Sequence, residues 1–139
     1  MTALSSDLKN AGYQCGRLLA VYEDLQHRVS GKNDMLSRYY SGCSQRPAFV
    51  LGRLQQLASY YMGKLKSSWY KEYYNGLLSD IYQEIQGDVP KMLSVSDQAY
   101  FAVGYWKQVA AMRREEAQHS ENGKKSGSDA NSDANVEVN

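Results

Sequence analysis

The chain has 139 residues, of which 42% are hydrophobic and 22% are charged, with 11 glycines and 2 prolines. This length suits one domain of ordinary size and excludes a second domain of the same size. Val, Ile and Thr number only nine between Ser5 and Glu116, and this scarcity excludes a sheet protein and favours an all-α fold. No run of about 18 apolar residues is present, and residues 1–10 lack the pattern of a signal peptide. We therefore expect a soluble, cytoplasmic protein with no membrane partner.

Five helices are predicted along the chain, and the first runs from Leu8 to Val29. Apolar residues recur there at spacings of three and four, which is typical of a helix that packs one face on a partner. Ser5 or Ser6 can cap its start, and Ser30-Gly31 ends it.

The second and third predicted helices lie in the middle of the chain. A short helix is expected from Met35 to Tyr40, because Ser41-Gly42 then breaks the apolar pattern. The next helix begins at Pro47, whose ring is preset for the first helical position, and it ends near Lys66. Its apolar residues again follow helical spacing, so one face of this helix is expected to pack in a bundle.

Two further helices complete the predicted bundle. Ser67 or Ser68 opens the fourth helix, and Ser94 opens the fifth, with Asp97 three positions later as in a capping box. The apolar pattern stops after Glu116, and the remaining residues have almost nothing to bury. We therefore predict a compact all-α bundle of about five helices with a disordered C-terminal tail, divided as residues 1–116 and residues 117–139.

Positive charge is concentrated in the middle of the chain. Residues 28–71 carry eight basic side chains and one acidic side chain, a net charge of +7, whereas the flanking segments are weakly acidic. Seven of the twelve tyrosines lie in or just past this basic segment. Cations interleaved with aromatic rings suit a single nucleic acid strand, because phosphates bind Lys and Arg and unstacked bases lie on rings. A solvated basic face with tyrosines half buried in the bundle explains the same composition.

A helical wheel of the third predicted helix brings part of this charge together. Lys64 lies in line with Arg46, Arg53 lies within about 20° of them, and Tyr60 is about 40° away. We expect the three cations to contact phosphates and Tyr60 to stack a base. The predicted nucleic-acid-binding residues are Arg46, Arg53, Lys64, Tyr60, Arg38, Lys66 and Lys71.

Residues suited to catalysis are few. The chain has two histidines. Three pairs of acidic or histidine residues lie four positions apart on a predicted helix, but none has a third metal ligand nearby, so we expect ordinary surface pairs. These pairs are Glu23 with His27, Asp80 with Glu84, and Glu115 with His119. Cys15 and Cys43 are expected to be small buried hydrophobes. We predict no catalytic residue, no metal site and no cofactor.

Three sequence blocks together carry a family resemblance. They are Tyr13–Gln26 (YQCGRLLAVYEDLQ), Arg38-Tyr-Tyr with Pro47-Ala-Phe-Val50 and Lys64-Leu65, and Leu93–Gln98 (LSVSDQ) with Phe101 and Gly104-Tyr105. Their order over roughly residues 11–109 resembles the C-terminal helical region of the large subunit of type I-C CRISPR effector complexes (Cascade). That region is also produced separately as the small subunit, and a chain that opens at Met1 just before the first block resembles this free form.

The resemblance implies a helical bundle without a catalytic role. Such a subunit packs in copies along the backbone subunits, beside the large subunit, and holds the displaced non-target DNA strand when an R-loop opens. Any involvement with the guide RNA is indirect, and cleavage belongs to a separate nuclease-helicase. The alternative is a purely structural subunit whose basic segment and tyrosines bind neighbouring proteins without contacting DNA.

One departure from the family concerns the start of the third helix. The family usually has Thr-Pro where this chain has Arg46-Pro47. An Arg cannot accept the first helical amides, which costs about 1 kcal/mol unless another acceptor replaces the Thr. We therefore expect a phosphate to bind at this helix start beside Arg46.

Overall fold

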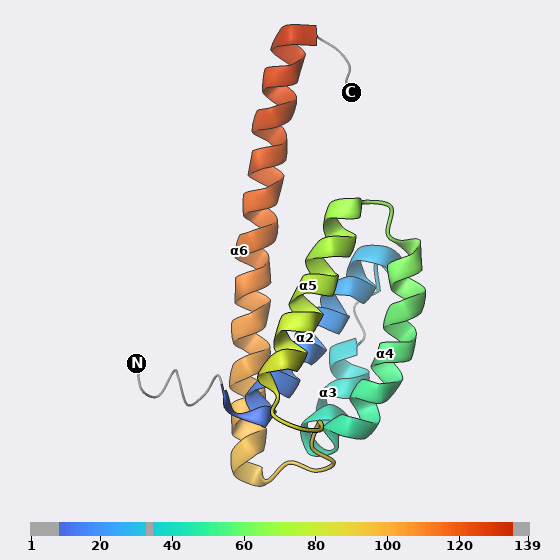
Figure 1. Ribbon diagram of the computed structural model, residues 1–139, viewed down its shortest axis with the longest axis vertical. Coiled ribbons are helices and arrows are strands. Elements are labelled where there is room, and N and C mark those ends of the chain that lie inside the picture. The colour runs from blue at the N-terminus through green and yellow to red at the C-terminus, as the bar shows by residue number, and fades with distance from the viewer. Residues whose placement is uncertain (1–8, 33–34, 135–139) are drawn as a thin grey trace. The chain divides into compact units, whose positions relative to one another are not determined.

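The computed structural model describes residues 9–32 and 35–134, with side chains described for 9–32 and 37–123. This part of the chain contains helices and no strand, which confirms the predicted all-α bundle (Figure 1). The helices are α2 Ala11–Ser30, α3 Met35–Gln45, α4 Pro47–Lys64, α5 Ser68–Glu84 and α6 Val95–Ala134. The chain divides into two compact units, residues 1–109 and residues 110–139, and the division falls within α6.

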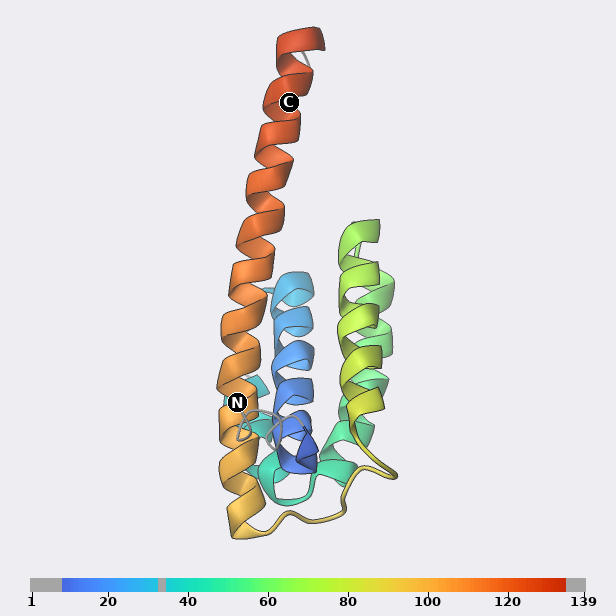
Figure 2. The same ribbon diagram turned by 60° about the vertical axis from the view of Figure 1, so that its left-hand side comes forward.

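Helix α2 is the centre of the first unit. It packs against α3, α4 and α5, and Figure 2 shows it beside the first part of α6. Leu18, Leu19 and Leu25 on this helix are fully buried. The Asn10 side chain caps its start by accepting from the Tyr13 amide at 3.0 Å, so the helix begins at Ala11.

The predicted bounds of this first helix are partly confirmed. Its end is as expected, because Gly31 adopts a left-handed conformation with φ of 74° and donates its amide to the His27 carbonyl. Its predicted start is wrong, because Asn10 is an extended N-cap and the helix begins at Ala11 rather than at Leu8. The proposed caps Ser5 and Ser6 lie outside the described residues.

Three glycines allow α2 and residues 95–109 of α6 to meet through their backbones. A Cβ on Gly12, Gly16 or Gly104 would overlap a backbone carbonyl oxygen of the facing helix. Polar side chains join the same two segments, since Arg17 Nε donates to Gln108 Oε1 at 2.9 Å and Tyr105 donates to Glu23. This contact positions the start of α6 on the bundle core.

The second helix is longer than the sequence pattern predicts. Helix α3 continues through Ser41-Gly42 to Gln45, so the expected break after Tyr40 is wrong. Cys43 on this extension is fully buried, and its burial offsets the roughly 1 kcal/mol that a glycine costs inside a helix.

The other helix starts agree with the sequence prediction. Helix α4 begins at Pro47 and ends at Lys64, close to the expected Lys66. Ser67 caps α5 by accepting from the Tyr70 amide at 3.3 Å. Ser94 caps α6 by accepting from the Asp97 amide at 3.1 Å.

The last helix extends beyond the end of its apolar pattern. The sequence predicts an end near Glu116, whereas the α6 backbone continues as a helix to Ala134. The described side chains after Glu116 are exposed apart from the half-buried His119, in agreement with a segment that has little to bury. None of the described helices combines the length and apolarity that a membrane span requires.

Candidate nucleic-acid interface

The predicted cations of α4 lie together on its exposed surface. Arg46 at the N-cap and Arg53 and Lys64 within the helix are all exposed. Because α4 is continuous from Pro47 to Lys64, the predicted alignment applies to Arg53 and Lys64. Arg46 precedes the helix as its N-cap, with a non-helical backbone (φ −134°, ψ 71°). The adjacent face of α4 is buried, through Val50, Leu51, Leu54 and Ala58, so the cations border the buried face rather than oppose it. We call Arg46, Arg53, Tyr60 and Lys64 the α4 stripe.

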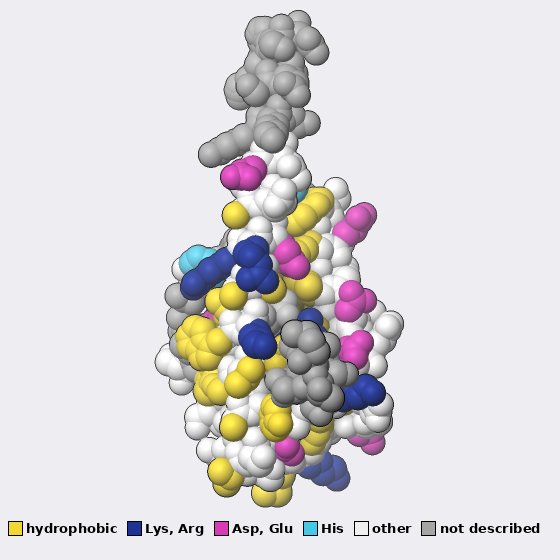
Figure 3. All heavy atoms as spheres, turned by 90° about the vertical axis from the view of Figure 1, so that its left-hand side faces the viewer, with side chains coloured by type: hydrophobic (Ala, Val, Ile, Leu, Met, Phe, Trp, Pro, Cys, Tyr) yellow, Lys and Arg dark blue, Asp and Glu magenta, His cyan; other side chains and the backbone are white. Residues whose placement is uncertain are grey.

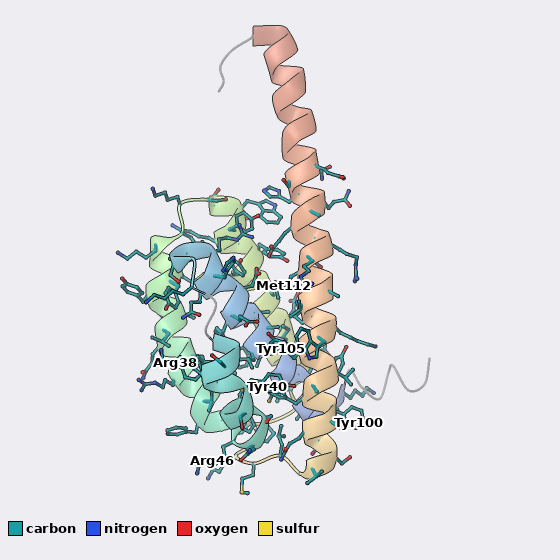
Figure 4. The ribbon with its side chains drawn as sticks, turned by 180° about the vertical axis from the view of Figure 1, so that it is seen from behind. Arg38, Tyr40, Arg46, Tyr100, Tyr105 and Met112 are labelled. Carbon is teal, nitrogen blue, oxygen red and sulfur yellow. The ribbon has the colours of Figure 1, made fainter. Side chains whose placement is uncertain are left out.

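Aromatic rings accompany the cations at both ends of the α4 stripe. Tyr60 is 61% exposed, and its ring centroid lies 5.2 Å from Lys64 Nζ. At the other end, Arg46 Cζ lies 5.9 Å from the centroid of the Phe49 ring, and Figure 4 shows Arg46 where α4 begins. A strand on this surface would meet positive charge and flat apolar rings together.

The start of α4 has a different capping partner from the expected phosphate. The Arg46 side chain makes no capping hydrogen bond. The Ala48 amide donates instead to the Pro90 carbonyl at 3.0 Å, so a backbone acceptor from the α5–α6 connection satisfies one of the amides that a Thr would face. An anion is therefore not needed at this amide.

The remaining predicted residues are distributed over three segments. Arg38 is exposed on α3, where its Cζ lies 5.6 Å from the Tyr39 ring centroid. Lys66 is exposed in the short connection between α4 and α5, and Lys71 is exposed on α5. Of these three, Lys66 lines a cavity together with Lys64.

This cavity, which we call the basic cavity, lies where α2 ends, α4 ends and α5 begins. Its volume is about 310 Å³. Three cations from different segments line it, namely Arg28, Lys64 and Lys66. The other lining residues are Val29, Leu65, Ser67 and Tyr70.

Arg28 is held in place by two tyrosines of α5. Its Cζ lies 3.7 Å from the Tyr70 ring centroid, and its Nε donates to the Tyr74 hydroxyl at 2.9 Å. The same hydroxyl donates to Asp24 at 2.7 Å. Burial raises the pKa of Tyr74, and its hydrogen bond to Asp24 raises the pKa further. The hydroxyl therefore stays protonated and bridges the cation and the carboxylate.

The sequence analysis missed Arg28 as an individual site residue. It lies within the basic segment, but a helical wheel relates only residues of one helix. Arg28 belongs to α2, and packing of α2 against α4 and α5 brings it to Lys64 and Lys66. The sequence signal that could have indicated this role is its place in the last turn of α2, just before a short connection.

Of the residues considered for catalysis, Glu23 and the two cysteines are engaged or buried, whereas His27, Asp80 and Glu84 are exposed. Glu23 accepts from Tyr105, and both cysteines are fully buried and free of disulfides, as predicted. Burial raises the pKa of the Cys15 thiol to about 12 and also raises the pKa of Cys43, so neither thiolate forms readily at neutral pH. Among the residues with described side chains, no group of three His, Cys, Asp or Glu is arranged to hold a metal ion.

Exposed apolar side chains occur at one end of the bundle. Phe49, Met92 and Val95 are 73%, 74% and 84% exposed. The segment containing Met92 is held against the α3–α4 junction, since the Leu93 amide donates to the Gln45 carbonyl at 3.1 Å. Figure 3 shows further hydrophobic side chains over the first part of α6. Exposed apolar groups of this size are typical of surfaces that bind other proteins.

Comparison with known proteins adds one finding. The family model described as CRISPR-associated protein (Cas_Csd1) matches residues 1–113. A search of curated proteins finds no match. The matched span contains the whole α4 stripe and every residue that lines the basic cavity.

Proposed function

Because the chain belongs to the Cas_Csd1 family of CRISPR-associated proteins, we propose that it is a small subunit of a type I-C effector complex (Cascade). In this role it packs in copies beside the backbone subunits and the large subunit in the cytoplasm. It stabilises the displaced non-target DNA strand of the R-loop and has no catalytic activity. The family membership and the resemblance of its three sequence blocks support this assignment.

The observation that carries the DNA-binding part of the proposal is the α4 stripe. Its three exposed cations extend from the N-cap Arg46 to Lys64, 18 residues further on, which is about 27 Å at 1.5 Å per residue. A strand stacked as in a duplex would place about eight phosphates along this length at 3.4 Å each, and a strand with unstacked bases would place fewer. The exposed Tyr60 ring beside Lys64 adds a surface on which a base can stack.

The contacts of such a strand are independent of sequence. The stripe offers charges and ring faces, and its cations bind phosphates that every nucleotide carries. The displaced strand should therefore be held equally well whatever its sequence. Each phosphate contact that is lost should lower the slope of log affinity against log salt by about 0.7.

Charge reversal of the α4 stripe tests this function in the assembled complex. The variant carries Arg46→Glu, Arg53→Glu and Lys64→Glu, and its matched control carries Lys9→Glu, Lys91→Glu and Lys107→Glu, three exposed lysines outside the basic segment. We expect both complexes to assemble, and we expect R-loop lifetime to fall at least tenfold in the stripe variant alone. The measurement is R-loop dissociation at two salt concentrations. Equal lifetimes for the stripe variant, the control and the unmodified complex would show that the stripe does not hold DNA.

The exposed apolar end favours a second candidate, a purely structural assembly subunit that binds neighbouring proteins without touching DNA. Phe49 is part of the exposed apolar end, since its side chain is largely exposed, and it also lies next to the α4 stripe, since its ring is near Arg46. This candidate predicts a different result for the stripe variant, namely loss of assembly because the cations face acidic surfaces of other subunits.

A further inference from the structure

The basic cavity concentrates positive charge in a small volume. Arg28, Lys64 and Lys66 come from α2, α4 and the connection to α5, and none of the described residues lining the cavity is acidic. Arg28 is linked to Asp24 through the Tyr74 hydroxyl, so the attraction of the cavity for an anion comes mainly from Lys64 and Lys66. The arrangement therefore favours an anionic ligand over a neutral or cationic one.

One of the three cations is positioned before any ligand binds. Arg28 lies over the Tyr70 ring and donates to Tyr74, whereas Lys64 is exposed, with its Nζ 5.2 Å from the centroid of the exposed Tyr60 ring. Side chains that are already held lose less conformational entropy when they bind a ligand. The face of Tyr70 is covered by Arg28, so this cavity suits the phosphate part of a nucleotide rather than its base.

Stabilisation of the helix ends accounts for only part of the positive charge in the basic cavity. Arg28 and Lys64 lie in the last turns of α2 and α4, where a cation offsets the negative end of the helix dipole. Lys66 lies between the α4 C-cap at Leu65 and the α5 N-cap at Ser67, where the negative end of α4 and the positive end of α5 act on its charge with opposite signs. The positive end of α5 begins at Ser67, so it adds to the potential in the cavity rather than offsetting it.

We infer that the basic cavity binds a phosphate group, with Lys66 and Lys64 as its principal ligands beside Arg28. At about 310 Å³, the cavity has the volume of about ten water molecules at about 30 Å³ each, which accommodates a phosphate group with part of its hydration shell. The inference rests on the proposed function only in naming nucleic acid as the source of that group. The group is either an internal diester of a strand or a terminal monophosphate.

The test is a titration of the ¹⁵N-labelled full chain with inorganic phosphate, followed by NMR at constant ionic strength. We expect saturating shifts of the Ser67 and Tyr70 amides. Lys66→Gln should weaken binding about fivefold, the effect of one charge near 4 Å in water. Lys71→Gln, which removes an exposed lysine that does not line the cavity, should leave affinity unchanged. Shifts that grow linearly without saturation, or equal affinities for both variants, would overturn the inference.

Two further ligands distinguish the sources of the phosphate group. An oligothymidine without terminal phosphates offers only diesters, and thymidine 5′-monophosphate offers only a monoester. The inference is supported if either ligand binds the protein and Lys66→Gln weakens that binding. The ligand that binds then identifies the source of the phosphate group. The double variant Arg46→Glu and Arg53→Glu changes the α4 stripe and leaves the cavity intact. If this variant loses R-loop stability but still binds phosphate, the DNA-binding function of the stripe and the phosphate site of the cavity are shown to be independent.

Discussion

The Tyr74 hydroxyl joins two opposite charges of α2 in the core of the first unit. It accepts from Arg28 and donates to Asp24, and its ring is fully buried. A pair of hydroxyls also links α2 to α5, where the oxygens of the buried Tyr22 and the half-buried Tyr82 lie 2.8 Å apart. Tyrosines of this chain therefore serve as internal hydrogen-bonding groups as well as exposed rings.

These buried groups predict alkaline destabilisation. Burial raises the pKa values of Tyr22, Tyr74, Cys15 and Cys43 above their ordinary values of about 9 to 10. Above pH 9 the unfolded chain releases these protons while the native protein retains them, so the free energy of unfolding falls as pH rises. Urea unfolding should give a constant free energy from pH 7.5 to 8.5 and a progressive loss between pH 9 and 11. A free energy independent of pH up to 11 would contradict the burial of these groups.

Individual exposed cations were easier to predict than their tertiary neighbours. The wheel predicted which side chains of α4 align, because helical periodicity alone determines their angular positions, and the structure adds that Arg46, Arg53 and Lys64 are exposed. Whether they bind DNA stays a prediction. The basic cavity was not predicted, because it depends on how the ends of α2, α4 and α5 meet.

At the scale of helices, the contact between α2 and the first part of α6 depends on glycines. Gly12 and Gly16 are one turn apart on α2, and each faces a backbone carbonyl of α6. Gly104 faces the Tyr13 carbonyl from the other side. A side chain at any of these positions would force the two helices apart.

The variant Gly16→Ala tests this close approach. Its Cβ would overlap the Phe101 carbonyl oxygen, so we expect a destabilisation of about 1–3 kcal/mol or more. The matched control is Gly52→Ala in α4, because a Cβ at this position would meet nothing within 4 Å. We expect this control to stabilise the protein by about 0.5–1 kcal/mol. Urea unfolding measures both. A neutral or stabilising effect of Gly16→Ala would show that the helices do not approach this closely.

Helix starts were predicted better than helix ends. Pro47, Ser67 and Ser94 each carry a local signal that the structure uses, because capping involves only neighbouring residues. The ends of α3 and α6 were not predicted. The extension of α3 depends on the burial of Cys43, and α6 continues to Ala134 without an apolar pattern that would have indicated it.

Across the first unit as a whole, charged and apolar surfaces have different places. The α4 stripe and the basic cavity gather cations of α2, α4 and the connection to α5. Phe49, Met92 and Val95 expose apolar area at the end where α4 and α6 begin. Under the proposed function, the cations hold the displaced strand and the apolar end contacts neighbouring subunits. The two roles occur together in one small bundle.

The most direct test of this account is photo-crosslinking in the assembled complex with an open R-loop. A benzophenone side chain replaces Tyr60 in the α4 stripe, and a control carries it at Lys107, an exposed position of α6. We predict that position 60 crosslinks to the displaced non-target strand, irrespective of the strand's sequence, and that position 107 does not. Crosslinks from position 60 to protein subunits alone, with none to DNA, would contradict the account.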